Sequence, residues 1–307
     1  MKVFTVSALI ACGIATVAHA QQAARTSMEA YLVRAGKKPE KLFLLGGKPS
    51  EFSFVKTVQS TQARQGKLSG GASIFFIQPA DFSKAMDLFE GRKYGEAATA
   101  FADVASKYAG FSDFEDNYST LAGFYELESL RKQLAVADLV QKAAGFDAKH
   151  LSNTEQLQQI EIYKFWQLMQ SKSWKQLVSL SDEWKAKTIA DSHRAQIAYC
   201  RAVALQGLGK QDEALDAYAG AFTADTFKSS ELVRAAAIAA LEIYLADKAV
   251  AAEIAAWGTA KQNKASKGYK WLVEANALAK LYNKTGMGSG VDLDPKFAAI
   301  LKCTPSK

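Results

Sequence analysis

Apolar residues recur every three or four positions from residue 80 to about residue 284, in a stretch with almost no proline. This spacing puts apolar side chains on one face of a helix, so it predicts amphipathic α-helices separated by short breaks. Gly91, Gly145 and Gly209 fall where such helices would end. The pattern predicts five helical hairpins and one last helix: 82–91 with 94–108, 113–133 with 134–145, 153–171 with 173–187, 191–208 with 211–224, 229–246 with 247–260, and finally 267–284.

A small or aliphatic residue recurs at one place in the second helix of each predicted hairpin. The positions are Ala97, Ala137, Leu177, Ala214 and Ala252. Their spacing of about 37 to 40 residues is typical of supersecondary units that stack in a row. The sequence therefore predicts a mainly α fold built as an α-solenoid.

The segment before the helices, residues 42–79, has a different character. Short runs rich in aromatic and branched residues (42–45, 52–58 and 73–77) stand between glycine and proline breakers. Such runs are typical of β-strands. Two or three short strands are not a stable domain alone. We expect a small β cap that covers the open end of the solenoid, preceded by a polar segment at 21–41.

The first twenty residues resemble a secretory signal. A positive start, Met1-Lys2, precedes a mostly apolar stretch, and Ala18-His19-Ala20 fits the small-x-small cleavage pattern before Gln21. A second interpretation is a lipobox that would put a lipid on Cys12. The apolar stretch is shorter than the roughly 18 residues of a membrane span, and no later segment is better. The prediction is an exported chain, periplasmic or associated with the outer membrane, without a transmembrane segment.

The charge of the chain bears on its partner, and its cysteines bear on whether it forms a disulfide. The net charge of the full chain is +7, and its basic residues form no dense stripe interleaved with aromatics. Together with export, this argues against nucleic acid as a partner. Beyond the signal only Cys200 and Cys303 remain. An exported protein can form a disulfide, but sequence alone leaves it open whether these two thiols meet.

The hairpins resemble tetratricopeptide repeats, which place small residues where two helices cross and aromatic residues between repeats. The fourth unit carries the pattern best, and the first unit carries it nearly as well. The middle units depart from it, because Leu177 replaces a small residue and the spacing exceeds that of the family. The matching residues are Ala202, Leu205, Leu208, Gly209, Ala214, Tyr218 and Ala221, and in the first unit Tyr94, Ala97, Phe101, Ala105 and Tyr108.

The resemblance implies a right-handed α-solenoid of about five hairpins across residues 80–285, followed by a loop and tail at 286–307. It also implies a concave groove lined by the first helices. An apolar, aromatic groove suits an extended or helical peptide. The alternative is that these residues are packed in the core. The groove residues so implied are Ala122, Glu126, Ser129, Ile162, Trp166, Met169, Tyr199, Val203, Gln206, Arg234, Leu241 and Tyr244.

Signals of catalysis or metal binding are weak. His150 and His193 are the histidines left after export, both in polar surroundings that predict exposure to solvent. No HExxH, CxxC or Gly-x-Ser-x-Gly motif occurs. The carboxylate pairs Glu126–Glu128 and Asp212–Glu213 do not share a helix face. We expect neither catalysis nor a cofactor.

The sequence therefore favours a non-catalytic protein-interaction scaffold in the bacterial cell envelope, with a protein or peptide partner in the concave face of the repeats. The alternative is a carbohydrate- or peptidoglycan-binding module, because exposed aromatic side chains stack on sugar rings. The tryptophans available for stacking are Trp166, Trp174, Trp184, Trp257 and Trp271.

Overall fold

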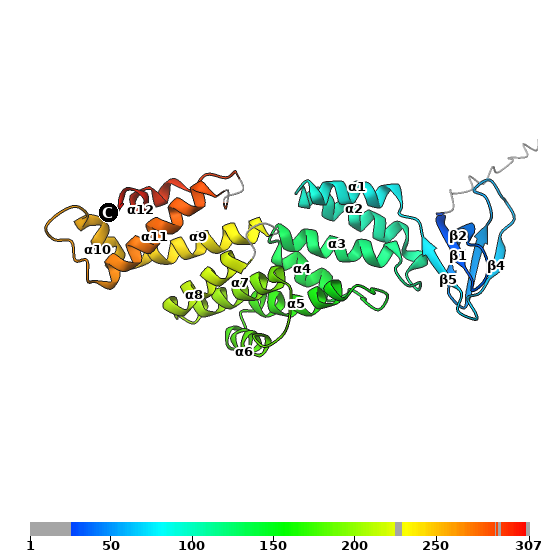
Figure 1. Ribbon diagram of the computed structural model, residues 1–307, viewed down its shortest axis with the longest axis horizontal. Coiled ribbons are helices and arrows are strands. Elements are labelled where there is room, and N and C mark those ends of the chain that lie inside the picture. The colour runs from blue at the N-terminus through cyan, green and yellow to red at the C-terminus, as the bar shows by residue number, and fades with distance from the viewer. Residues whose placement is uncertain (1–25, 225–228, 286, 288–289, 305–307) are drawn as a thin grey trace, which may run out of the picture.

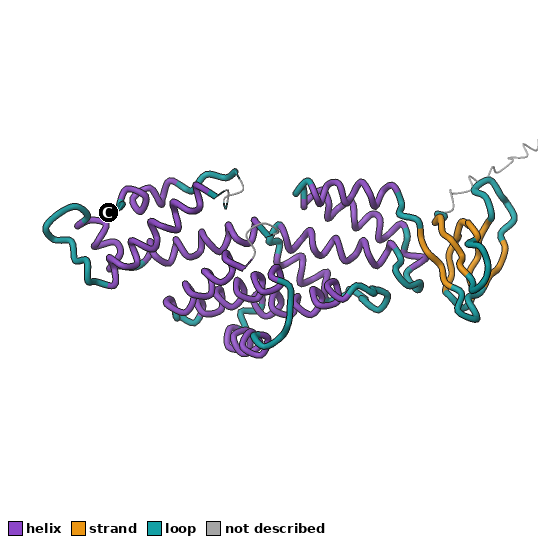
Figure 2. The backbone as a smooth tube through the Cα atoms, in the orientation of Figure 1, coloured by secondary structure: helices purple, strands orange, loops and turns teal. Residues whose placement is uncertain are grey.

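The computed structural model describes residues 26–224, 229–285, 287 and 290–304. The predicted signal at 1–20, with Cys12, lies outside the described residues. Within the described part a five-stranded antiparallel sheet precedes twelve α-helices, and the protein is mainly helical. The molecule is elongated, with the sheet at one end (Figures 1 and 2).

The sheet consists of short strands whose side chains alternate between two faces. The strands are β1 Met28–Val33, β2 Glu40–Lys48, β3 Glu51–Val55, β4 Arg64–Gly66 and β5 Ser73–Phe76. They lie in the order β4-β3-β2-β1-β5, and every neighbouring pair is antiparallel. Met28, Ala30, Leu32, Leu42 and Leu44 are buried on the inner face.

The first strand was not predicted. β1 lies in the segment 21–41, for which the sequence predicts a polar terminus, yet it is an inner strand that pairs with both β2 and β5. Its signal is the alternation of buried Met28, Ala30 and Leu32. Met28, Tyr31 and Leu32 also fit one turn of helix, and this spacing obscures the strand. The sheet therefore begins before the predicted boundary at residue 42.

The helices form antiparallel hairpins that follow one another along the molecule (Figure 1). Asparagine, aspartate and serine side chains at 117, 153, 247 and 266 cap helices by accepting bonds from free N–H groups. The helices are α1 Ala80–Glu90, α2 Tyr94–Lys107, α3 Tyr118–Lys132, α4 Val136–Ala143, α5 Thr154–Gln170, α6 Trp174–Trp184, α7 Asp191–Gly207, α8 Gln211–Ala224, α9 Ser230–Ala246, α10 Lys248–Ala256, α11 Lys267–Lys284 and α12 Ala298–Lys302.

The sheet and the first helices share one hydrophobic core. Phe76 of β5 contacts Phe111 and Phe114, in the loop between α2 and α3, at ring-centroid distances of 6.3 and 5.8 Å. Phe52 of β3 also contacts Phe114, with 6.1 Å between ring centroids. Aromatic edges and faces attract in such tilted pairs. The sheet is thereby anchored to the helices through the loop between α2 and α3.

The first four hairpins close with the same turn. Its central residue has left-handed backbone conformation, with φ of 60° at Arg92, 58° at Leu134, 54° at Lys172 and 75° at Gly209. The N–H of this residue donates to the carbonyl three positions earlier, and the next N–H donates to a leucine carbonyl. This pair of bonds is the Schellman motif that ends many helices. The accepting leucines are Leu88, Leu130, Leu168 and Leu205.

The fourth residue of the second helix is buried in each of these hairpins. These residues are Ala97, Leu139, Leu177 and Ala214, and all are fully shielded from solvent. The predicted positions Ala137 and Ala252 are wrong, because both side chains are exposed. In α10 the fully buried residue is Val250. The predicted alignment assumed nearly even steps, whereas the turn in the second hairpin comes two residues later.

The C-terminal end is closed by a short segment that returns to α11. Asn276 is buried in α11, and its Nδ2 donates to the carbonyl of Ile300 at 2.7 Å. Phe297 and Ile300 of the returning segment are fully buried. Cys200 and Cys303 are both buried free thiols, so they do not form a disulfide. α11 is therefore covered by α12 rather than left as a lone helix.

The turns make a direct stability test possible. A Cβ added at Gly209 meets open space, so Gly209→Ala introduces only the left-handed conformation, which costs about 1–2 kcal/mol. Lys172 is exposed in the same conformation. We expect Gly209→Ala to lower the free energy of unfolding by about 1 kcal/mol and Lys172→Gly to raise it by up to about 1 kcal/mol. Guanidinium unfolding measures both; a destabilised Lys172→Gly contradicts the prediction.

Candidate functional site: a polar pocket between first helices

A pocket opens where several first helices of the hairpins converge. Its volume is about 280 Å³. The walls come from the ends of α1 and α3 and from the N-terminal parts of α5, α7 and α9. The lining residues are Phe89, Phe124, Tyr125, Glu128, Arg131, Lys132, Asn153, Glu155, Gln156, Gln159, Ser192, His193 and Ser229. We call this cavity the central pocket.

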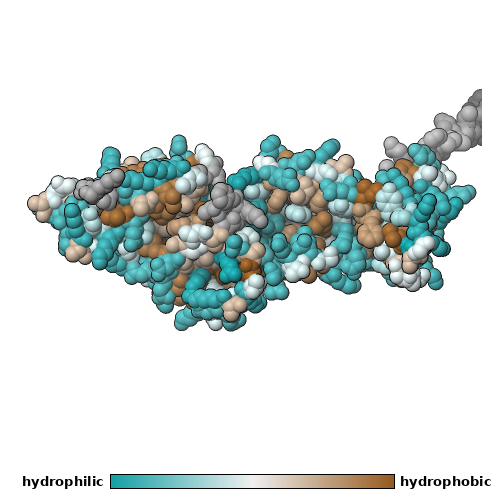
Figure 3. All heavy atoms as spheres, viewed as in Figure 1, coloured by the Kyte–Doolittle hydropathy of each residue, from teal (hydrophilic) through white to brown (hydrophobic). Residues whose placement is uncertain are grey.

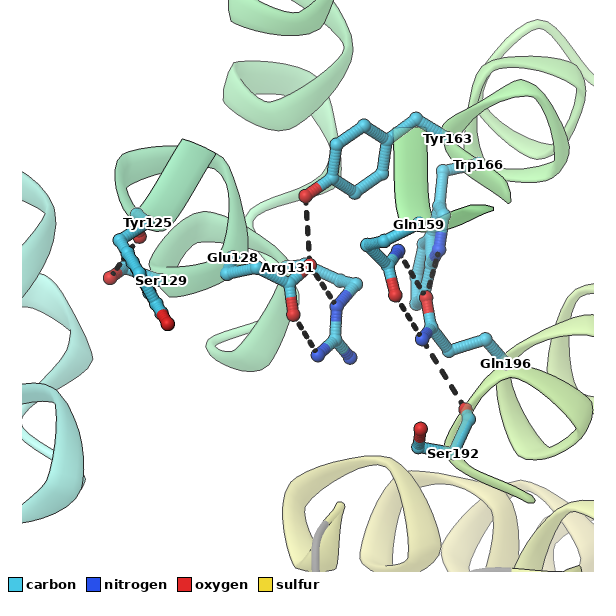
Figure 4. A network of polar contacts seen from close by, with 9 residues as sticks. All are labelled: Tyr125, Glu128, Ser129, Arg131, Gln159, Tyr163, Trp166, Ser192 and Gln196. Carbon is cyan, nitrogen blue, oxygen red and sulfur yellow. Dashed lines mark hydrogen bonds and ion pairs between the residues drawn. The ribbon is translucent and has the colours of Figure 1, made fainter. Parts of the chain in front are cut away.

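A buried ion pair forms part of the pocket floor (Figure 4). Glu128 and Arg131 lie one turn apart on α3, so their side chains share a face. Arg131 Nε donates to Glu128 Oε1 at 2.8 Å and Arg131 Nη2 to Oε2 at 2.6 Å. Tyr163 Oη of α5 donates to the same Oε1 at 2.8 Å. This network joins α3 to α5.

Each group in this network influences the ionisation of the others. Burial alone would raise the pKa of the Glu128 carboxyl, but the charge of Arg131 and the hydrogen bonds from Arg131 and Tyr163 outweigh it, and the pKa is lowered. Burial raises the pKa of the Tyr163 phenol, with the charge of Glu128 acting in the same direction. At neutral pH Glu128 is therefore an anion and Tyr163 a donor.

A second polar cluster joins α5 to α7 (Figure 4). Gln159 and Gln196 exchange two amide hydrogen bonds, of 3.0 Å from Gln159 and 2.8 Å from Gln196. Trp166 Nε1 donates to Gln196 Oε1 at 3.1 Å, and Gln196 also donates to the Ser192 carbonyl at 3.3 Å. Buried amides are costly without partners. Here they are satisfied across the helix pair, which positions α7 against α5.

His193 stands at the start of α7 and lines the same pocket. The residue is only 5% exposed, so the prediction of a solvent-facing histidine is wrong. Its Nδ1 is buried and has no hydrogen-bond partner among the described residues. Burial lowers the pKa of His193 below its ordinary value. The imidazole is accordingly neutral at neutral pH.

The rim is bridged between the first hairpin and the fifth. Arg92, in the turn after α1, donates from Nη1 to Ser230 Oγ and lies 3.5 Å from Glu231 Oε1. Ser230 and Glu231 begin α9, more than a hundred residues further along the chain. Tyr125 stacks on Phe101 with 5.4 Å between ring centroids. The rim thus combines aromatic and polar groups.

The groove residues implied by the tetratricopeptide resemblance do not line this pocket. Five of them are buried in the core: Ala122, Ser129, Ile162, Trp166 and Leu241. Tyr244 is also buried and donates to Glu274 at 3.0 Å. The half-buried members are Glu126, which pairs with Lys142, and Met169, Tyr199, Val203, Gln206 and Arg234.

The pocket differs from the expected groove in two ways: it uses a different face of α3, and it uses positions closer to the N-termini of α5 and α7. On α3 the pocket uses Tyr125, Glu128 and Lys132, one residue away from the expected stripe. On α5 and α7 it uses the first turns of each helix, before the expected residues. The available signal was the placement of polar residues such as Gln159 and Gln196 on otherwise apolar faces.

The tryptophans proposed for sugar stacking are used for packing. Trp166, Trp184 and Trp271 are buried. Lys187 and Lys267 Nζ lie 3.6 and 4.0 Å above the rings of Trp184 and Trp271. Trp257 stacks on Tyr269 with an interplanar angle of 12°, and Trp174 packs against Gly207. Trp174 and Trp257 are only half-buried.

The chemistry within reach of the pocket is limited. Cys200 lies deeper in α7, and burial raises its thiol pKa well above the ordinary value, so the thiol stays protonated. In the described part of the chain no three His, Cys, Asp or Glu residues gather as a metal site would require. None of the helices described is both long and apolar enough to cross a membrane.

Comparisons with family models, with curated proteins and with solved structures give no match for this chain.

The buried ion pair gives a second prediction. Arg131→Met leaves the Glu128 carboxylate buried without its partner, which costs about 3–5 kcal/mol. Replacing the whole network by apolar groups, in Glu128→Met/Arg131→Met/Tyr163→Phe, leaves no orphaned charge. We expect the single variant to lose about 3 kcal/mol of unfolding free energy and the triple variant to lose less. A triple variant less stable than the single one, measured by urea unfolding, contradicts the prediction.

His193 gives a prediction about pH. Because its pKa is lowered in the folded protein, the unfolded chain takes up a proton first as pH falls below 6.5. Stability contributed by the neutral imidazole is present above that pH and is lost between 6.5 and the lower folded pKa. We expect the melting temperature to fall between pH 7.5 and pH 5, and His193→Asn to flatten this slope. His150→Asn controls for removing a histidine; an unchanged slope in His193→Asn contradicts the prediction.

Proposed function

We propose that this protein is a non-catalytic interaction scaffold of the bacterial cell envelope. In this proposal residues 80–285 form a right-handed, tetratricopeptide-like α-solenoid of about five hairpins, and a protein or peptide partner binds the concave side formed by the first helices. The chain is exported, and no cofactor takes part.

The observation that carries the proposal is the central pocket itself. Three of its lining groups are already engaged, because Arg131 pairs with Glu128 and Gln159 pairs with the buried Gln196. The remaining lining offers an aromatic ring, Tyr125, and the exposed carboxylate of Glu155, together with amides and hydroxyls. Such a mixture of donors and acceptors matches peptide groups, which carry both. The charges of Glu128 and Arg131 are neutralised by each other, so this pair contributes shape and rigidity, while the neutral His193 adds a polar group to the lining.

The repeated hairpin turns support the solenoid. The same Schellman motif ends the first helix four times, each time from a leucine carbonyl. Identical turns set nearly the same relation between the two helices of a hairpin, which is how repeat proteins build a continuous surface. First helices then align side by side, as α5, α7 and α9 do around the pocket.

A site-specific cross-linking experiment tests the scaffold role. Ser192 lines the central pocket, whereas Ser179 is exposed on α6, away from it. A photo-crosslinking amino acid at each position, in cells that produce the protein, compares the two surfaces. We expect a discrete adduct with one envelope protein from position 192 and none from 179. Adducts from neither position, or the same adducts from both, would contradict a partner in the pocket.

Export has its own test. If the signal is removed after Ala20, the protein recovered from the periplasmic or outer-membrane fraction begins at Gln21. N-terminal sequencing of that protein and its absence from the fraction when residues 1–20 are deleted are the expected results. An intact Met1 terminus in the cytoplasmic fraction contradicts the proposal, and a lipidated Cys12 corrects its localisation to a membrane anchor.

A further inference from the structure

We propose that the free edge of β5 binds an extended peptide by strand addition, with an apolar peptide side chain in the adjacent cleft and a basic side chain beside Glu115. The inference stands without the proposed scaffold role, because it rests on the sheet edge and its cleft alone. It adds a peptide-binding site in the N-terminal sheet, outside the concave pocket.

β5 is an edge strand with unpaired backbone groups. It pairs only with β1, in the register Ala30 opposite Phe76 and Leu32 opposite Ile74. The N–H of Ile77 donates to Glu29 at 2.9 Å, and bonded pairs alternate along an antiparallel ladder. The amide groups of Ile74 and Phe76 therefore point away from β1. Among the described residues they have no hydrogen-bond partner.

Apart from its length of only four residues, the β5 edge lacks the features that usually block strand addition. Natural edge strands carry charges, prolines or bulges that prevent pairing with other chains. The opposite edge of this sheet, β4, carries Arg64 and is followed by Lys67. β5, with the sequence Ser-Ile-Phe-Phe, has none of these, and Phe75 is 58% exposed. An unprotected edge of this kind is the surface that peptide-binding sheets use.

A cleft of about 530 Å³ runs beside this edge. On one side are Ile74 and Phe76, and on the other Tyr118 and Leu121 of α3 with Leu151. Figure 3 shows apolar residues gathered where the sheet meets the helices. Side chains alternate along an added strand, so one set of them faces the cleft while the other faces solvent. The cleft thus offers an apolar pocket next to free backbone groups.

The far wall of the cleft is fixed in place. The N–H of Asp116 donates to the carbonyl of His150 at 3.2 Å, and Ser152 Oγ donates to Asp116 Oδ1 at 2.6 Å. Asn117 Nδ2 donates to the carbonyl of Phe114 at 2.7 Å. Since Phe114 also contacts Phe76, both walls belong to one packed unit. A rigid site loses little conformational entropy when a peptide binds.

The cleft is acidic in a basic protein. Glu115 and Asp116 line it, and no lysine or arginine is among its lining residues. Glu115 Oε1 lies 3.4 Å from His150 Nδ1, but the side chain of Glu115 is 74% exposed and accessible to a further basic group. The chain as a whole has a net charge of +7. Local charge of opposite sign selects a basic partner and opposes a second copy of this basic chain. The occupant is therefore an extended peptide that combines apolar residues with lysine or arginine.

A synthetic peptide tests strand addition. The probe is a fluorescein-labelled six-residue peptide of alternating lysine and valine, and its binding to the purified protein is followed by fluorescence anisotropy. In two isomers either the valine or the lysine amides are N-methylated. One edge of an added strand pairs with β5, so one isomer should bind at least about tenfold more weakly than the other. Equal affinities, whether both isomers bind or neither does, would overturn strand addition.

Protein variants locate the peptide. Ile74→Pro removes an outward N–H without removing a ladder bond to β1, a position where edge strands tolerate proline. We expect it to weaken binding of the unmethylated peptide at least about tenfold, whereas Ile74→Val retains binding. Circular dichroism checks that the sheet persists. Unchanged affinity in a folded Ile74→Pro protein rules out the β5 edge.

Charge reversal provides a variant that does not touch the sheet. Glu115→Lys should weaken binding of the lysine–valine peptide and favour a peptide in which glutamate replaces lysine. The same affinity order for both peptides in wild type and Glu115→Lys would remove Glu115 from the site. Light scattering addresses the other occupant: a dimer that Ile74→Pro converts to a monomer would show that a second copy, not a peptide, covers β5. Asn153 and Gln156, which the cleft shares with the central pocket, are left unchanged throughout.

Discussion

In the middle of this protein α3, α5 and α7, each the first helix of a hairpin, are joined by hydrogen bonds between buried polar side chains. Glu128 and Arg131 on α3 meet Tyr163 on α5, and Gln159 on α5 meets Gln196 on α7. The hydrophobic effect is non-directional, so apolar contacts alone specify the register of two helices less strictly. A reciprocal amide pair or a forked ion pair specifies it more strictly, because a shift of one turn would leave buried donors and acceptors unmet. These bonds therefore set the register of α3, α5 and α7, and with it the shape of the pocket that they line.

The register of the central helices also links the two ends of the molecule. The sheet is fastened to α3 through Phe114 and the loop before it, while α9 and α11 pack beyond α7. Each of these contacts joins only two adjacent elements, but the orientation of each element depends on the element before it. The peptide-binding cleft beside β5 and the central pocket share residues at the start of α5. Both surfaces are consequently oriented by the same helix.

The helices were predictable from sequence because their apolar periodicity is long and regular, and residues 267–284 coincide with α11. The hairpin turns were only partly visible. A glycine at position 209 indicates a left-handed backbone conformation, but Arg92, Leu134 and Lys172 adopt the same conformation although their residue types do not indicate it. The leucine four positions before each turn residue is the feature that a sequence search would need. With it, the second hairpin aligns on Leu139 rather than on Ala137.

The pocket was less predictable than the fold. Its polar residues lie far apart in sequence and look like ordinary surface residues until α3, α5 and α7 are brought together. His193 was expected on the surface because its neighbours Asp191, Ser192 and Arg194 are polar, yet the helix turns it inward. β1 was missed for the opposite reason, since a few apolar residues fit either period.

The contact from Arg92 to the start of α9 lies close in sequence to Phe89 and Ser229, which line the central pocket. Arg92 is nearly half exposed, and pairs of this kind contribute roughly 0–1 kcal/mol. That energy is close to the thermal energy, so the bond between the first and fifth hairpins breaks and re-forms freely while the helices stay folded. This ion pair therefore holds the first and fifth hairpins together only weakly. Opening this contact costs little, and salt weakens it further because it screens charges that face solvent.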